Sequence, residues 1–390
     1  MARTQAKLAK THREDKRPPF EQIALLLQGG GALGAYQAGV FEAIAEAGLE
    51  PDWIAGISIG AINSAIIAGN APEHRVEKLR AFWEEITTDL QALELGPMLP
   101  DALVGDAYRG MLSRLGSALS LVQGQRGFFA PRQVPPFLAM PGSPAATSFY
   151  DTTALESTLT RLVDFDRINA GPMRFSVGAV NVRTGNFVYF DNRTHRIGPR
   201  HVMASGSLPP GFPAVEIEGE HYWDGGLVSN TPLQYVLETL PRRDTLAFQV
   251  DLWNARGELP RDIAEVMSRE KEIRFSSRTR LNTDYMTRMQ RLRQAADALI
   301  KKLPPELAAC VEAEILKPFA CERVYNVVHL IYRSKGFEDQ AKDYEFSKLG
   351  MREHWTAGYH DAVHTLRHKE IFERPAHGDP VRVFDLTDER

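Results

Sequence analysis

The chain has 390 residues, and its 43% hydrophobic and 25% charged content is ordinary for a soluble globular protein with a sizeable core. Its formal net charge of −4 gives no basic footprint for nucleic acid, so we expect no nucleic-acid partner. No apolar run reaches the roughly 18 residues of a membrane span, and the N-terminus lacks the apolar centre of a signal peptide, so we predict a cytoplasmic location. The two cysteines, Cys310 and Cys321, give no disulfide framework.

The chain begins with a basic stretch. Residues 1–19 carry six Lys or Arg against two acids and show no hydrophobic periodicity. We predict a mobile arm whose charge suits peripheral contact with an anionic membrane. From residue 20 to residue 87 the pattern alternates strand, helix, strand, helix, as an open parallel sheet requires.

The first predicted strand, Ile23–Leu27, leads into a glycine-rich loop, QGGGALG at residues 28–34, and then into a helix. Glycines bring backbone N–H groups close to a ligand and a helix N-terminus adds positive potential, so the loop suits an oxyanion hole. The spacing Gly29-x-Gly31-x-x-Gly34 also satisfies the dinucleotide fingerprint, which keeps a nucleotide site as an alternative. That fingerprint needs an acid at the end of the second strand, whereas Asp52 lies at its start.

The second predicted strand, Trp53–Ala55, runs into Gly56-Ile57-Ser58-Ile59-Gly60 and then into an apolar helix at residues 61–68. A serine between two glycines on a sharp strand-to-helix turn is typical of a nucleophile elbow, which exposes the serine hydroxyl. The sequence therefore predicts Ser58 as the nucleophile of a serine hydrolase. The alternative is a tight turn between two core elements.

Residues 88–148 interrupt the alternation with a Pro/Gly/Phe-rich run at residues 124–144, which is typical of a lid or binding loop. Its apolar side chains either line a path for an acyl chain or pack in the local core. They are Phe128, Phe129, Phe137, Leu138 and Met140.

Further along, Asp224-Gly225-Gly226 ends a short aromatic strand, which indicates either an exposed acid or a hairpin turn built on Asp-Gly. A Ser-His-Asp triad would need a later histidine, and His329, on the predicted strand at residues 324–332, is the candidate. We expect a two-residue site, because an α/β-hydrolase places its serine after several strands and His329 has the pattern of a core histidine.

The C-terminal part combines a strand at residues 245–252, charged helices at residues 260–302 and a last helix at about residues 349–369. Four arginines on these helices either form a basic surface that contacts lipid head groups or belong to a solvated helix face. They are Arg269, Arg274, Arg278 and Arg280. His360, His364 and His368 recur every four residues on the last helix, a spacing that zinc can use. No cysteine or carboxylate cluster accompanies them, so we predict no metal site.

Three motifs now stand in one order: the glycine-rich loop, the G-x-S-x-G of Ser58 and the Asp-Gly-Gly of Asp224. In this order they resemble the signatures of the patatin-like phospholipases, and the likeness covers residues 20–235. The later half is similar to a bacterial branch of that family with a C-terminal extension. Leu33 stands where the family often has Arg or Lys, which bears on any charge contact with a phosphate head group.

The resemblance implies a three-layer α/β/α catalytic domain at residues 20–235, with residues 88–148 as a lid or insertion, and a mainly helical C-terminal extension at residues 236–390. It implies a Ser58–Asp224 dyad that hydrolyses acyl esters of lipids or phospholipids without cofactor or metal. The implied oxyanion donors are the backbone N–H groups of Gly29, Gly30, Gly31 and Ile59. Three alternatives remain: a Ser-His-Asp esterase of small soluble esters, a dinucleotide-binding oxidoreductase, and a catalytically silent lipid-binding protein of the same fold.

Overall fold

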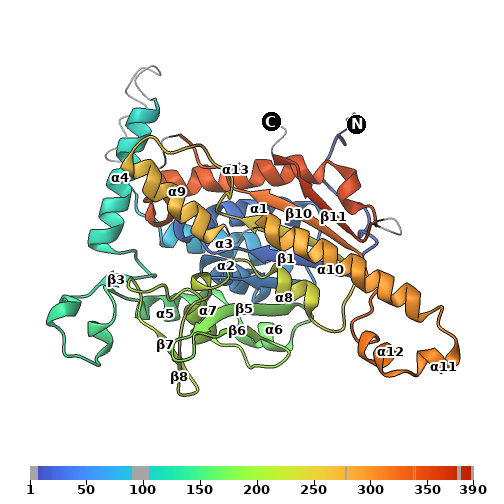
Figure 1. The fold of residues 1–390 in the computed structure, drawn as a ribbon. Coiled ribbons are helices and arrows are strands. Elements are labelled where there is room, and N and C mark those ends of the chain that lie inside the picture. The colour runs from blue at the N-terminus through green and yellow to red at the C-terminus, as the bar shows by residue number, and fades with distance from the viewer. Residues whose placement is uncertain are drawn as a thin grey trace.

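A mixed nine-stranded sheet runs through the molecule in the order β11-β10-β9-β1-β2-β5-β8-β7, with β6 paired to β5 (Figure 1). The computed structural model describes residues 8–89, 105–276, 279–336, 338, 340–375 and 379–387. The strands of the sheet are β1 (Gln22–Leu27), β2 (Trp53–Gly56), β5 (Arg174–Asn181), β6 (Phe187–Asp191), β7 (Val215–Ile217), β8 (Glu220–Asp224), β9 (Thr245–Asp251), β10 (Tyr325–Ile331) and β11 (Val381–Asp385). The six strands from β11 to β5 are parallel, whereas β6 and β8 run antiparallel to β5, and β7 antiparallel to β8.

Helices cover both faces of the sheet (Figure 1). They are α1 (Ala35–Glu46), α2 (Ile59–Ala68), α3 (Arg75–Glu85), α4 (Asp106–Gln123), α5 (Thr153–Leu162), α6 (Phe165–Ala170), α7 (Pro199–Ser205), α8 (Leu233–Glu238), α9 (Ile263–Phe275), α10 (Thr279–Ile300), α11 (Pro305–Ala308), α12 (Val311–Leu316) and α13 (Lys348–Leu366). The larger core includes side chains from α1, α2, α3 and α13, and the smaller core, on the opposite face, includes side chains from α8 and α10. The predicted layered α/β fold class is confirmed.

The alternation of side chains along β1 explains why its sequence is apolar throughout. Ile23, Leu25 and Leu27 enter the larger core, while Ala24 and Leu26 point to the opposite face and enter the smaller one. A parallel strand that is buried on both faces has no polar side to show, so its apolar residues form a continuous run. This position in the middle of the sheet carries the glycine-rich loop, which follows Leu27 directly.

The C-terminal part of the chain belongs to the same sheet. β9 pairs with β1 on one side and with β10 on the other, so the sheet continues across the predicted boundary at residue 235. α13 lies directly against α1 (Figure 1). Glycines allow this approach, because a Cβ on Gly39 would collide with the carbonyl of Trp355, and one on Gly358 with the carbonyl of Tyr36. The described part of residues 236–390 therefore contributes strands to the same sheet and helices to its cover.

Within the predicted insertion at residues 88–148, the structure describes residues 88–89 and 105–148. α4 is followed by the short strand β3 (Ala130–Pro131), which pairs with β4 (Tyr150–Asp151). The aromatic and apolar residues of this segment divide into two groups. Phe128 and Phe129 are each 6% exposed and belong to the larger core, whereas the side chains of Phe137, Leu138 and Met140 lie on the surface.

The described part of the predicted N-terminal arm, residues 8–19, lies along the protein rather than projecting from it. The N–H of Ala9 donates to the carbonyl of Arg367 at 3.0 Å, and the N–H of Glu14 donates to Ala47 at 3.1 Å. This segment is at the opposite end of the molecule from α4 (Figure 1). Within the described ranges, no helix has both the length and the apolar character needed to cross a bilayer.

Candidate active site

Ser58 occupies the sharp turn between β2 and α2. Its backbone adopts φ 56° and ψ −123°, a left-handed conformation that a non-glycine residue holds only where its surroundings enforce it. The N–H of Ser58 donates to Ser205, to the carbonyl at 3.1 Å and the hydroxyl at 3.0 Å. Both flanking glycines are required, because a Cβ on Gly56 would collide with the carbonyl of Gly60, and a Cβ on Gly60 with that of Leu27. This is the elbow geometry that the sequence predicts.

Asp224 is the last residue of β8, and its side chain lies beside that of Ser58. In the sheet, β5 separates β8 from β2, the strand that precedes Ser58. Asp224 is 2% exposed, and its carboxylate accepts a hydrogen bond from the Gly226 N–H at 2.7 Å. Burial raises the pKa of Asp224 to about 7, against the opposing effect of hydrogen bonds from the Ser58 hydroxyl and Gly226. A carboxyl with a pKa near neutrality exchanges a proton readily with a bound hydroxyl.

The glycine-rich loop lies directly over the serine. A Cβ on Gly29 would lie 2.9 Å from the Ser58 Cβ, so the backbone reaches the nucleophile only because residue 29 has no side chain. The side-chain amide of Asn230 holds this glycine from both sides: its Oδ1 accepts from the Gly29 N–H at 3.1 Å, and its Nδ2 donates to the Gly29 carbonyl at 3.0 Å. Trp253 Nε1 donates to the same carbonyl at 2.9 Å.

The N–H of Gly29 is therefore engaged with Asn230. Among the described residues, no backbone or side-chain acceptor is found for the N–H groups of Gly30, Gly31 and Ile59. Ile59 is the first residue of α2, and its N–H belongs to the positive end of that helix. Of the four predicted oxyanion donors, these three N–H groups are the ones without an acceptor among the described residues.

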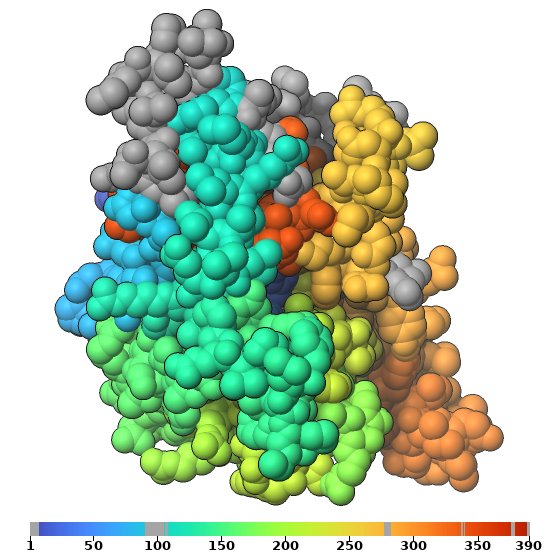
Figure 2. Space-filling view, turned by 90° about the vertical axis from the view of Figure 1, so that its left-hand side faces the viewer, coloured from blue at the N-terminus to red at the C-terminus, as the bar shows by residue number. Residues whose placement is uncertain are grey.

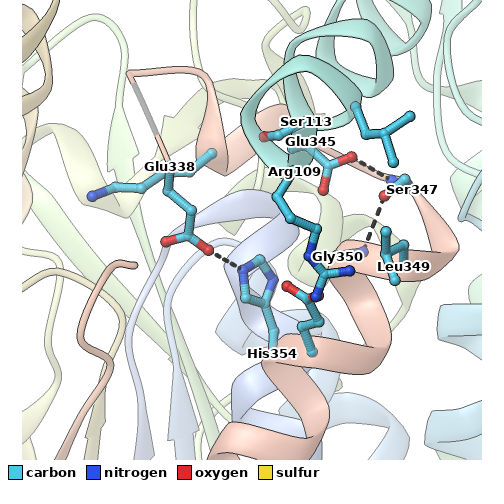
Figure 3. Close-up of a pocket in the computed structure, with 11 residues that line it drawn as sticks. Arg109, Ser113, Glu338, Glu345, Ser347, Leu349, Gly350 and His354 are labelled. Atoms are coloured by element: carbon cyan, nitrogen blue, oxygen red, sulfur yellow. Dashed lines mark hydrogen bonds and ion pairs between the residues drawn. The ribbon is translucent and has the colours of Figure 1, made fainter. Parts of the chain in front are cut away.

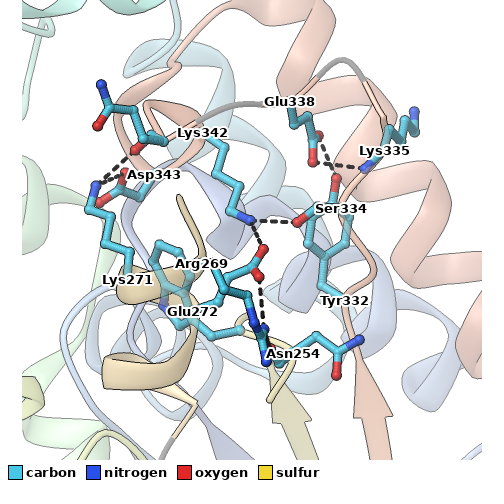
Figure 4. A network of polar contacts seen from close by, with 12 residues as sticks. Asn254, Arg269, Lys271, Glu272, Tyr332, Ser334, Lys335, Glu338, Lys342 and Asp343 are labelled. Atoms are coloured by element: carbon cyan, nitrogen blue, oxygen red, sulfur yellow. Dashed lines mark hydrogen bonds and ion pairs between the residues drawn. The ribbon is translucent and has the colours of Figure 1, made fainter. Parts of the chain in front are cut away.

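The C-terminal region holds the outer side of the loop. A Cβ on Gly31, whose φ is 55°, would collide with the carbonyl of Asp343 in the 3-10 turn η9 (Lys342–Tyr344). Desolvation raises the pKa of the Asp343 carboxyl, which is largely shielded from solvent and pairs with Lys271 of α9 at 2.5 Å. Figure 4 shows this pair beside a second one, between Lys342 and Glu272 at 2.6 Å. The loop is thus fixed between the elbow and a partly buried ionic network.

Asn230, Trp253 and Asp343 are residues that the sequence motifs do not single out. Each of them contacts a glycine of the loop that lies more than 200 positions earlier in the chain. A buried asparagine in the turn that follows Asp224 is the one local signal, because an amide offers both a donor and an acceptor to a loop.

His329 lies away from the serine. It is buried on β10, with Nδ1 3.5 Å from Asp251 Oδ2. Three strand spacings separate β10 from β2, which amounts to about 14 Å across the sheet. This placement favours a two-residue site over a triad through His329.

The acid that a nucleotide site would need also lies elsewhere. Asp52 accepts from the N–H of Ile23 at 2.6 Å, at the start of β1, and pairs with Arg17. Asp52 thus lies at the start of the parallel strands, whereas the glycine loop lies at their carboxyl end.

Of the three histidines predicted on the last helix, His360 and His364 lie on α13, whereas His368 lies beyond its end at Leu366. His364 and His368 pack edge to face with ring centroids 5.2 Å apart. Over the described ranges, no three His, Cys, Asp or Glu side chains are grouped so as to hold a metal ion. Cys310 and Cys321 are both free thiols.

The predicted basic surface on the C-terminal helices is largely paired within the protein. Arg269 pairs with Glu272 at 3.0 Å and donates to backbone carbonyls, and Arg274 pairs with Glu270 at 2.8 Å. The side chains of Arg278 and Arg280 lie outside the described residues.

A small cavity lies between α4 and the chain around Glu338 and His354 (Figure 3), and Ser58 is not among the residues that line it. Its volume is about 20 Å³, enough for roughly one water molecule. His354 Nε2 lies 2.9 Å from Glu338 Oε1 on its wall, and Arg109 of α4 pairs with Glu353. The cluster attaches α4 to α13 and has no room for an acyl chain.

Two family models match this chain. The model of the patatin-like phospholipases matches residues 25–237, and a second model, described as patatin phospholipase, matches residues 273–378. The first covers more than half of the chain and contains the glycine loop, Ser58 and Asp224.

Curated relatives match a shorter part. Lysophospholipase nte1 of Aspergillus terreus is 47% identical over 60 residues, 15% of this chain and 4% of its own length. Patatin-like phospholipase domain-containing protein 7 of Rattus norvegicus is 33% identical over 95 residues, 24% of this chain and 7% of its own length. The human patatin-like phospholipase domain-containing protein 6 is 32% identical over the same length. The chain thus spans less than a tenth of these relatives.

A solved structure, that of VipD from Legionella pneumophila, aligns with all of this chain and 78% of its own, at a TM-score of 0.39 and 14% identity. The family model, which spans the loop, the elbow and the acid, identifies the chain as a member of the patatin-like phospholipase family.

Proposed function

We propose that this protein is a lipid acyl hydrolase of the phospholipase A type, which cleaves carboxylic esters through a serine acyl-enzyme. The observation that carries the proposal is the position of Ser58, on its strained elbow, next to the buried carboxyl of Asp224. The lipid substrate is supported by the family match and by relatives named lysophospholipase and patatin-like phospholipase. No cofactor enters the reaction that we propose.

In the first half of the reaction, the Ser58 Oγ attacks the ester carbonyl carbon as its proton passes to the Asp224 carboxylate. The carbonyl oxygen becomes an anion, which the N–H groups of Gly30, Gly31 and Ile59 stabilise. Removing one such donor typically costs about 3 kcal/mol of transition-state stabilisation. The intermediate then expels the alcohol, which takes the proton from Asp224, and leaves an acyl group on Ser58.

Asp224 is ionised again after it has given its proton to the alcohol. In the second half, water attacks the acyl carbon and gives a proton to this carboxylate. The second tetrahedral anion collapses in the same donor set. It releases the fatty acid, and the Ser58 oxygen recovers its proton from Asp224. A pKa of about 7 equips this carboxyl for both proton transfers.

The proposal is tested with a short-chain ester that is fully dissolved, so that no lipid surface is involved. Ser58→Ala and Asp224→Asn should each lower turnover by roughly three orders of magnitude or more, because the two groups act as one unit. A fluorophosphonate probe should label wild-type protein at Ser58 and leave Ser58→Ala unlabelled. Ser64→Ala, a buried serine on the same helix, is the matched control and should keep both activity and labelling.

Near-normal turnover in Asp224→Asn would exclude the dyad, and a folded but inactive His329→Ala would support the triad instead. A wild-type protein that neither hydrolyses the ester nor takes the probe would support the silent lipid-binding alternative. Thermal protection by NAD or NADP would support the nucleotide alternative.

A further inference from the structure

One continuous stretch of chain, residues 107–149, turns apolar side chains toward solvent. On α4 the exposed side chains include Met111, Leu115, Ala118 and Val122, which recur at helical spacing and so share one face. Beyond β3, the tip of the segment exposes Phe137 by 81%, Leu138 by 77% and Met140 by 79%. An apolar surface of this extent on a folded protein marks a place of contact with another apolar phase.

The charge on this stretch has one sign. Between Ala107 and Tyr150 the sequence holds four arginines and no acidic residue or lysine. Two of the arginines are ion-paired, Arg109 with Glu353 and Arg132 with Asp151. Arg126 is exposed. The stretch itself thus combines apolar side chains with arginine and with no acidic residue, which suits an anionic lipid surface better than a second copy, whose like charges would repel.

The base of the segment is anchored beside the candidate active site. Phe149 N–H donates to the carbonyl of Pro210 at 3.1 Å and Tyr150 N–H to that of Gly211 at 2.9 Å. The same stretch of chain, residues 205–212, receives the Ser58 N–H at Ser205. The exposed tip is therefore connected to the nucleophile through one short, hydrogen-bonded stretch.

The segment also borders the opening above the sheet. Figure 2 shows α4 in teal and the green segment that follows it on one face of the molecule. Between them and the orange C-terminal elements the face is hollowed, and deep blue atoms of the N-terminal part of the chain, which contains β1 and its glycine loop, are visible at the bottom. A membrane against this face would lie over that hollow.

We propose that residues 107–149 form the surface by which this protein docks on an anionic phospholipid bilayer. Phe137, Leu138 and Met140 enter the boundary between head groups and acyl chains, and Arg126 lies among the head groups. The inference rests on the proposed function, because it names the partner that presents substrate to Ser58. It also places the docking surface at the opposite end of the molecule from the basic N-terminal segment.

The test measures co-sedimentation with vesicles of phosphatidylglycerol mixed with phosphatidylcholine. The triple variant Phe137→Ser/Leu138→Ser/Met140→Ser should bind at least tenfold more weakly than wild type. The matched control is Leu307→Ser/Val311→Ser/Ile315→Ser, an apolar set on α11 and α12 that is also exposed, by 52%, 72% and 69%, and it should bind as wild type does. Both variants should keep the wild-type melting temperature and the wild-type hydrolysis of a dissolved short-chain ester.

A second pair of variants tests the charge. Arg126→Ala should weaken binding at low salt, and the difference from wild type should shrink as salt screens the head groups. Lys10→Ala removes the same charge from the far end of the molecule and should have no such effect.

The docking proposal is overturned if wild type ignores these vesicles, or if the triple variant binds them as well as wild type does. It is also overturned if wild type forms a dimer that the triple variant abolishes, since the occupant would then be a second copy. Ser58→Ala separates this proposal from the catalytic one, because it should bind vesicles normally while hydrolysing nothing.

Discussion

At the scale of single residues, the backbone of Ser58 is the least relaxed part of the site. A non-glycine residue in the left-handed region costs on the order of 1–3 kcal/mol, and it persists where neighbouring contacts enforce it. Here the two hydrogen bonds from the Ser58 N–H to Ser205 supply that constraint. The strain therefore falls on the residue whose hydroxyl must project toward a substrate.

The raised pKa of Asp224 predicts the pH dependence of hydrolysis. The carboxyl must be ionised to accept the serine proton, and burial raises its pKa to about 7. The kcat/KM for a dissolved ester should therefore rise with pH, reach half its maximum near pH 7 and level off above it. A pH profile measured on free enzyme checks this, and a midpoint near 4, the value of an unburied aspartate, would contradict it.

The same group predicts a pH-dependent cost to stability. Unfolded, the carboxyl has a pKa near 3.9, so between about pH 4 and pH 7 the folded state binds more protons than the unfolded state. The free energy of unfolding should therefore fall as pH rises through that window, and the cost remains in full above it. Asp224→Asn removes the charge, so its melting temperature should exceed that of wild type at pH 8 and approach it near pH 4. An equal difference at both pH values would refute this account.

At the scale of elements, the loop between β1 and α1 is a rigid part of the site because other elements hold its carbonyls and N–H groups. Gly29 is fixed by Asn230, from the turn after β8, and by Trp253, from the end of β9. Gly31 lies against the carbonyl of Asp343. Donors fixed in advance stabilise an oxyanion without reorganising during the reaction.

Trp253→Phe tests this rigidity by removing one N–H donor while keeping an aromatic ring. The free energy of unfolding should fall by about 1 kcal/mol, the usual value of one hydrogen bond. Turnover of a dissolved ester should fall by roughly tenfold with little change in KM, because the donors act on charge that appears in the transition state.

Trp53→Phe is its matched control. Trp53 Nε1 donates to the Ser176 hydroxyl at 2.9 Å, and its ring lies in the smaller core. This variant should lose similar stability and keep its turnover. Equal kinetic effects in both variants would show that the tryptophan near the loop acts through stability alone.

The elements around the site differ in how far sequence predicts them. Ile23–Leu27 and the turn at Ser58 are predictable because local rules decide them: an apolar run buried on both faces, and a backbone that tolerates only glycine beside the serine. Asn230 and Trp253 are not, because their contacts with Gly29 join residues 201 and 224 positions apart. The catalytic roles of Ser58 and Asp224 stay predictions.

The segment after α4 shows a second limit. Phe128 and Phe137 both stand in a Pro/Gly/Phe-rich run, yet one is buried against Phe212 and Phe346 and the other is exposed. Their fates depend on where β3 and β4 attach the segment, which periodicity does not encode. For the basic N-terminal stretch, charge alone predicts mobility, whereas backbone hydrogen bonds to Arg367 and Ala47 hold its described part in place.

At the scale of the whole molecule, the region matched by the patatin-like model and the C-terminal region share one sheet and one core, so we expect them to fold as one unit. β9 lies between β1 and β10, and Leu246, Phe248 and Val250 fill the larger core beside β1. A chain that ends at residue 237 would lose this central strand and uncover the edge of β1. We expect it to lack a cooperative thermal transition and to hydrolyse no ester. A truncated chain that melts cooperatively and retains turnover would disprove this dependence.

The position of β9 beside β1 also sets the order of events during synthesis. The strand that carries the glycine loop leaves the ribosome more than 200 residues before the strand that completes its hydrogen bonding. At about 5–20 residues per second, the interval is roughly 10 to 45 s. The contact of Gly31 with Asp343 must wait longer still. During that time the growing chain carries its serine motif without a finished glycine-rich loop, so we expect a ribosome-bound protein to be inert toward the membranes around it.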